Sequence, residues 1–94
     1  MARRVVVTGI GVVCATGANA PGFGRNLEAG VCGIAPRTFA PDDTLTMTAA
    51  VAPVDGFEER AAALGRDIAR TDRFTQGAVA AADEALADSG IVID

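Results

Sequence analysis

An apolar run near the N-terminus constrains the fold of this chain more than any other sequence feature. It extends from Arg3 to Val13, and valine or isoleucine occurs at both odd and even positions. A strand that is apolar on both faces is typical of the middle of a sheet that helices cover on both sides. Gly9 and Gly11 inside the run predict that another backbone approaches it closely. The run therefore predicts an α/β fold with this segment as a buried strand.

Turn residues and periodicity predict the elements that follow. Gly30 is expected to end the first helix in the left-handed conformation. In chain order we expect a helix over 21–29, a polar connection over 36–46, a strand over 47–54 and a helical stretch from Asp55 onward that carries Glu58, Arg60, Leu64 and Ile68.

The last helix has the clearest pattern. Thr71 or Asp72 is expected to cap it, and Gly90 to end it. Its small residues predict a smooth surface that lies close against a sheet or a second helix, and they are Gly77, Ala78, Ala81, Ala82 and Ala85. The β-branched residues 91–93 resume a strand-like pattern, so we expect the chain to break off inside a connection with its next strand missing.

Composition indicates a chain that is part of something larger. Its 94 residues suffice for one small domain, and half of them are apolar. Twenty of these are alanine, however, and the aromatic residues are four phenylalanines. Alanine buries little area, so an independent core would hardly offset the entropy of ordering the chain.

The absence of histidine and lysine limits the chemistry that the chain can perform. A nucleophile normally needs a neighbouring imidazole or amine as its base, and histidine is the commonest metal ligand. We therefore expect no catalytic residue, no metal site and no cofactor site. Cys14 and Cys32 are interpreted as small buried hydrophobic residues. The segment from Thr8 to Cys14 begins like a dinucleotide-binding fingerprint, but cysteine stands where the third glycine should open a helix.

Charge and the cysteine pattern bear on location and partners. A formal charge of -4 argues against a broad nucleic-acid-binding surface. The run after Arg3 and Arg4 imitates a secretory signal, but its glycines and β-branched residues favour a strand, and it is too short to span a bilayer. Two cysteines without a disulfide or zinc pattern fit a reducing compartment, so we expect a cytoplasmic protein without a membrane partner.

Three arginines have helical spacing in the C-terminal half. Arg66, Arg70 and Arg73 stand at i, i+4 and i+7, which would place them along one helical face. Interleaved with Asp67 and Asp72, this face could be merely solvated.

The order of three sequence blocks resembles the N-terminal segment of β-ketoacyl-acyl-carrier-protein synthases. The blocks are Arg3 to Val13, Leu27 to Ile34, and Thr71 to Gln76 running into Ala85 to Ile91. The resemblance covers essentially the whole chain. It implies a single N-terminal segment, residues 1–94, of a thiolase-like α-β-α-β-α sandwich that is incomplete on its own.

The resemblance also implies a function and partners. Members of this family extend an acyl chain by decarboxylative condensation with a malonyl carrier thioester, in fatty acid or type II polyketide synthesis. Their nucleophilic cysteine and two histidines lie downstream of the matched region, so this chain is expected to be scaffold. Arg66 and Arg70 match basic positions that dock the acyl carrier protein, while Ala69 departs from a position that is often basic. A cytosolic homodimer or heterodimer with a related subunit is implied.

Two alternatives remain open at the level of sequence. The chain could belong to a non-catalytic partner subunit that resembles a chain-length factor and shares the fold without the nucleophile. It could also be a free-standing interaction module. If the chain belongs to such a partner subunit or to the synthase itself, the remainder of that polypeptide or a second chain completes the protein.

Overall fold

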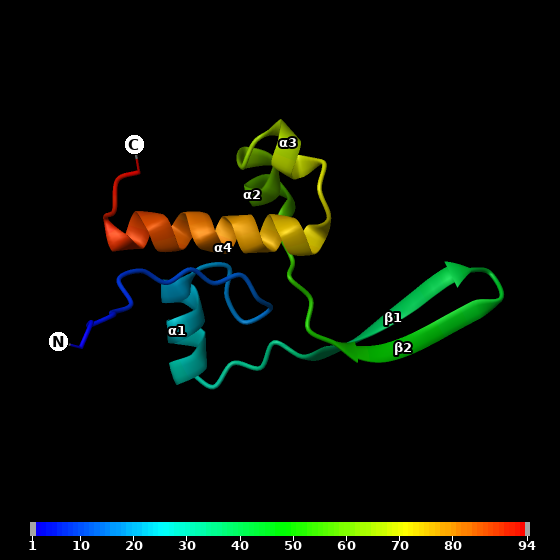
Figure 1. The fold of residues 1–94 in the computed structure, drawn as a ribbon. Helices are drawn as coiled ribbons and strands as arrows, with labels where there is room; N and C mark the ends of the chain where they lie inside the picture. The colour runs from blue at the N-terminus through cyan, green and yellow to red at the C-terminus, as the bar shows by residue number, and fades with distance from the viewer. Residues whose placement is uncertain (1, 94) are drawn as a thin grey trace.

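The computed structural model describes residues 2–93. Figure 1 shows helices on one side of the molecule and a two-stranded hairpin that extends away from them. The elements in chain order are helix α1 (Ala20–Glu28), strands β1 (Ala35–Asp42) and β2 (Leu45–Val51), and helices α2 (Glu58–Ala63), α3 (Arg66–Ala69) and α4 (Arg73–Ser89). Helices with a two-stranded antiparallel sheet are compatible with an incomplete α/β fold. None of the helices in the described range is long and apolar enough to cross a membrane.

The N-terminal segment lies along α4 (Figure 1). Residues 2–13 form no strand, so the prediction of a buried strand from Arg3 to Val13 is wrong for the described residues. The backbone of this segment pairs with side chains instead of a neighbouring strand. The Ile10 N–H donates to the carboxylate of Asp88 at 3.1 Å, and the Val12 N–H donates to Glu84 at 2.8 Å. The physical reason is that a sheet needs a second strand beside it, and the hairpin strands pair only with each other.

The expected close approach at the two glycines is confirmed. A Cβ atom at Gly9 would collide with the backbone of Ala85, and one at Gly11 would collide with the backbone of Ala81. The N-terminal segment therefore packs main chain against main chain on α4. The small residues of α4 make this contact possible, as the sequence predicted.

Helix α1 agrees with the sequence prediction to within one residue at each end. The Asn19 side chain accepts a hydrogen bond from the Gly22 N–H at 2.8 Å, and Pro21 lies in the first turn. Gly30 has a φ of 71° and ends the helix as expected. The Val31 N–H then donates to the Asn26 carbonyl at 2.9 Å, which satisfies one of the last carbonyls of the helix.

The hairpin corrects the prediction for residues 36–46, which form most of β1, the turn and the start of β2 rather than a polar connection. β1 and β2 are antiparallel, with Thr38 opposite Thr48, and their hydroxyls are 2.9 Å apart. Because β1 lies at a sheet edge, its prolines are tolerated. At the turn, the hydroxyl and backbone N–H of Thr44 bind the Asp42 carboxylate and lower its pKa.

The second predicted strand is confirmed as β2, although β2 begins and ends earlier than expected. The predicted helical stretch after Gly56 divides into α2 and α3 at Gly65, whose φ is 109°. Helix α4 begins after Asp72 and ends at Gly90 in the left-handed conformation, as predicted. Asp72 occupies the N-cap position, but its side chain makes no capping hydrogen bond, so this part of the prediction is wrong. Residues 91–93 form no strand.

The buried core of the described residues is small. Phe57, Ala61 and Ala80 are buried, and Val13, Val54 and Leu64 pack against them. Many large apolar side chains are exposed, among them Val5, Val6, Val7, Phe74, Leu86, Ile91, Val92 and Ile93. This pattern fits the expectation from composition that the chain alone cannot bury a sizeable core.

We predict that Gly11→Ala destabilises the packing of the N-terminal segment on α4 by about 1 to 3 kcal/mol, because the new methyl group overlaps the Ala81 backbone. The matched control is Gly24→Ala in α1, where a Cβ atom meets nothing within 4 Å and helix propensity should improve stability by about 0.5 to 1 kcal/mol. Urea unfolding of the purified protein measures the free energy of unfolding of both variants. If both substitutions change this free energy by the same amount in the same direction, the close contact is not important for stability.

We also predict that the chain alone is partly disordered, since the apolar side chains of Val5 to Val7 are uncovered. The Val5 side chain is 92% exposed, and Val6 and Val7 are similarly uncovered. Amide exchange of Val6 and Val7 should be nearly as fast as in an unfolded peptide. Strong protection of these amides in the lone chain would show that its core is larger than the structure indicates.

Candidate functional site

The two arginines predicted to contact a partner lie at the ends of α3. Arg66 is the first residue of this helix and Arg70 is its C-terminal cap, and both are exposed. Neither forms an ion pair within residues 2–93. Their positive charges are therefore available to an external carboxylate or phosphate.

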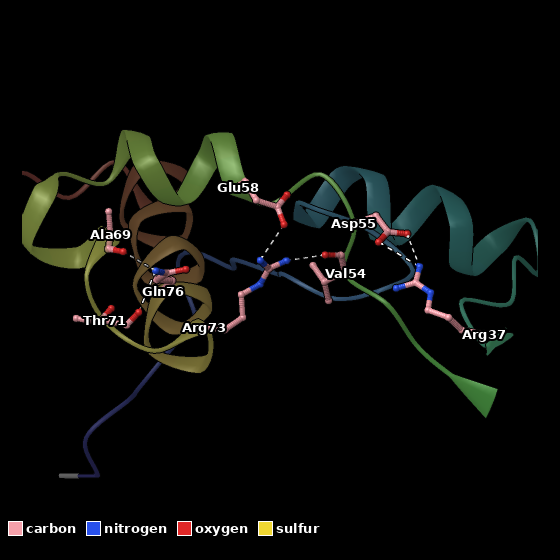
Figure 2. A network of polar contacts seen from close by, with 8 residues as sticks. All are labelled: Arg37, Val54, Asp55, Glu58, Ala69, Thr71, Arg73 and Gln76. Atoms are coloured by element: carbon pink, nitrogen blue, oxygen red, sulfur yellow. Dashed lines mark hydrogen bonds and ion pairs between the residues drawn. The ribbon is translucent and has the colours of Figure 1, made fainter. Parts of the chain in front are cut away.

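Arg73 does not share this face, and its predicted alignment with the other two arginines is wrong. The chain leaves α3 and restarts as α4, so the three residues are not on one continuous helix. The Arg73 guanidinium lies 3.0 Å from the Glu58 carboxylate and donates to the Val54 carbonyl at 2.8 Å (Figure 2). It also stands 5.0 Å from the centre of the Phe57 ring. Arg73 thus joins the start of α4 to the start of α2.

The electrostatics of Glu58 are consistent with this role. Its pKa is lowered, first because its carboxylate accepts its own backbone N–H and then because Arg73 donates to it and attracts it. The pair is largely exposed, so its contribution to stability is small. The main effect of the ion pair is that the Arg73 guanidinium is already bound to Glu58.

Gln76 holds the turn between α3 and α4, and sequence reasoning missed it. Its side-chain nitrogen donates to the carbonyls of Ala69 at 3.1 Å and Thr71 at 3.0 Å (Figure 2). The Thr71 hydroxyl donates to the Ile68 carbonyl at 2.6 Å. Neutral donors therefore fix the backbone that carries Arg70. The one sequence signal for Gln76 was its position in the third block of the family resemblance, which includes Thr71 to Gln76.

A second ion pair lies at the base of the hairpin. Arg37 of β1 and Asp55 are 3.3 Å apart (Figure 2), and both side chains are substantially exposed. This contact connects the hairpin to the segment that leads into α2.

Neither cysteine has the surroundings of a nucleophile. Cys14 is half-buried in a tight turn, where its N–H and carbonyl exchange hydrogen bonds with Gly17 at 3.0 and 3.2 Å. Cys32 is exposed, which corrects the expectation that it is buried. Within the described residues no group of three or more histidine, cysteine, aspartate or glutamate side chains could hold a metal ion.

The start of α1 is not a phosphate site either. The first N–H of this helix, at Ala20, already donates to the carboxylate of Glu84 at 2.9 Å. A helix N-terminus that binds phosphate offers its N–H groups to the ligand, whereas this one is partly occupied by an anion of the chain itself. The structure gives the fingerprint-like sequence around Gly11 a packing role instead.

An apolar groove lies beside the N-terminal segment. It is open to solvent and has a volume of about 560 Å³ between residues 11–13 and the first half of α4. Phe74, Gly77 and Ala78 line one side, and the Phe74 side chain is 77% exposed. The described residues leave this surface without a cover.

Comparison with known proteins defines the class of the chain. Residues 2–94 match the family model described as β-ketoacyl synthase, N-terminal domain. The chain is 40% identical over 92 residues to a protein named as polyketide β-ketoacyl synthase 1 from Streptomyces cyaneus, and the match covers 97% of this chain and 21% of the relative. It is 41% identical over 91 residues to a protein named as the oxytetracycline polyketide β-ketoacyl synthase 1 from Streptomyces rimosus, covering 96% and 21%.

The chain therefore belongs to the β-ketoacyl synthase family and corresponds to part of its N-terminal domain, as the resemblance predicted. It spans about a fifth of the length of these relatives. No solved structure matches the chain significantly.

Proposed function

We propose that this chain is the N-terminal scaffold segment of a polyketide β-ketoacyl-acyl-carrier-protein synthase. In the proposed reaction the malonyl thioester loses carbon dioxide, and the resulting enolate attacks an acyl thioester on a cysteine of the synthase. The new carbon–carbon bond forms as the cysteine thiolate leaves. The family match over residues 2–94 is the observation that carries this proposal.

The sequence and structure of the chain support a scaffold role for it. Stabilising an enolate oxygen needs a positioned donor such as imidazole, and the chain contains no histidine. The backbone of Cys14 is tied into a turn with Gly17, and the chain has no histidine or lysine to act as a base for its thiol. The reacting groups are therefore assigned to residues outside these 94.

The proposed complete fold is a thiolase-like α-β-α-β-α sandwich to which residues 1–94 contribute one undivided segment. The apolar groove beside α4 and the uncovered residues Val5 to Val7 support it, because both are surfaces that further layers would cover. In this proposal the remainder of the synthase, or a second chain, supplies those layers. The complete protein is proposed to act in the cytoplasm as a homodimer or a heterodimer.

A chain-length-factor-like subunit is the second candidate. The chain is also 36% identical over 89 residues to a protein named as polyketide β-ketoacyl synthase 2 from Streptomyces cyaneus, so it resembles two differently numbered synthases of one organism. The residue at the catalytic cysteine position of the complete protein decides between the two candidates.

We predict that the chain alone does not decarboxylate a malonyl carrier thioester, because it has no imidazole to steady the enolate. Release of carbon dioxide is the measurement, with the complete synthase as the positive control. Turnover above background that persists after Cys14→Ala and Cys32→Ala substitution would contradict the scaffold role.

Arg66 and Arg70 are proposed to form part of the docking surface for the acidic acyl carrier protein. Both are exposed, and neither forms an ion pair with another residue of the described range 2–93, which supports this role. Ala69 stands between them without a charge, so the patch is small. Exposed charges of this kind act mainly by steering the encounter of the two proteins, and their effect weakens as salt rises.

We predict that the double substitution Arg66→Glu, Arg70→Glu raises the KM for the carrier-borne substrate of the complete synthase by about tenfold at low salt. Turnover of a small thioester without the carrier should stay unchanged. The matched control is Arg3→Glu, Arg25→Glu, which alters the net charge by the same amount at two exposed positions elsewhere. If the control has the same effect, or if both substrates slow equally, the arginines of α3 are only a solvated face.

A further inference from the structure

One carboxylate joins three segments that are far apart in the sequence. Glu84 is half-buried in the middle of α4. Its Oε1 accepts the Val12 N–H at 2.8 Å, and its Oε2 accepts the Ala20 N–H at 2.9 Å. We propose that Glu84 is a latch that closes loop 13–19 and the start of α1 onto α4, and that neutralising it releases the loop while α2 and α4 stay folded.

The geometry requires an anion at this position. Both partners are N–H donors, and an ionised carboxylate is a pure acceptor with two oxygens. A protonated acid or a glutamine side chain turns a donor toward one of these N–H groups, so that one of the two hydrogen bonds is lost. Ala20 also begins α1, and the positive end of a helix favours a negative charge.

Other contacts also hold the loop: Val13 packs against the small core, and Asn19 accepts the Gly22 N–H of α1 at 2.8 Å. The Arg60 side chain donates to the carbonyl of Ala18 and to that of Ala80, the latter at 3.1 Å. The Asn26 side chain donates to the Thr16 carbonyl at 2.6 Å. Within residues 2–93, Glu84 is the one side chain that hydrogen-bonds both the residue before the loop and the residue after it, so the proposal places release of the loop there.

The charges around the carboxylate decide its response to pH. Arg60 faces it from α2, Asp83 and Asp88 precede and follow it on α4, and α1 carries Arg25 in its last turn. The pKa of Glu84 is lowered, first by the Ala20 N–H, then by the Val12 N–H, with a smaller contribution from Arg60.

Because the folded pKa lies below the ordinary one, the latch stabilises the closed loop above the ordinary pKa of glutamate. This stabilisation is lost as the pH falls through the lowered value. The closed form is therefore the form at neutral pH. Release needs either acid or a substitution that removes the charge.

The two cysteines supply a direct measurement of the loop. Cys14 is half-buried inside it, and Cys32 is exposed outside it and serves as an internal reference. Alkylation of each thiol at pH 7 is followed by peptide mass spectrometry in the purified protein, including any polypeptide that completes it. Glu84→Gln should raise the rate of Cys14 relative to Cys32 by about tenfold, since a closed loop shields the thiol.

Asp83→Asn is the matched control, because the side chain of this exposed neighbour on α4 makes no hydrogen bond within residues 2–93. It should leave the ratio of the two rates unchanged. An unchanged ratio in Glu84→Gln, or an equal rise in Asp83→Asn, overturns the proposal.

The second measurement is amide exchange of the unaltered protein. Unlike alkylation, it does not depend on the ionisation of a thiol. Protection of Val12 and Ala20, corrected for intrinsic exchange, should fall below about pH 4 while the amides of α4 remain protected. If α4 loses protection at the same pH, or in Glu84→Gln at pH 7, the loop does not open separately and the latch is refuted.

Discussion

The backbone contact between the N-terminal segment and α4 is the constraint on which the rest of this structure depends. A Cβ atom at Gly9 or Gly11 would collide with the carbonyls of α4. Only at this short separation can Asp88 and Glu84 reach the N–H groups of the segment from their own helix. The carboxylates then satisfy the N–H groups of Ile10 and Val12, which a sheet neighbour would otherwise bind, so this part of the segment is held on α4 without being a strand.

Much of the local structure could be predicted because it depends on residues close in sequence. The caps of α1 and α4 follow from Asn19, Gly30 and Gly90, whose conformations are set within one turn. The close approach at Gly9 was predictable because a glycine inside an apolar run has few other uses. β1 was missed because the prolines at its two ends suggested a connection, and proline is compatible with a strand whose outer edge is unpaired.

The candidate site shows where sequence spacing stops being informative. The period of Arg66, Arg70 and Arg73 assumes one continuous helix, and the break after α3 removes Arg73 from the face. What Arg73 does instead depends on Glu58 and the Phe57 ring, which tertiary packing brings beside it. Gln76 is equally invisible from sequence, since its two acceptors are backbone carbonyls that any residue would provide.

The hairpin has a consequence for how this part of the chain can change. β1 and β2 contact each other and no other helix or strand of the described chain, and their turn is closed locally by Asp42 and Thr44. Lengthening or shortening the hairpin tip alters no contact of the helices. The tip is therefore a suitable point for a genetically encoded label, and a position at which related proteins can diverge in length while keeping the helical part intact.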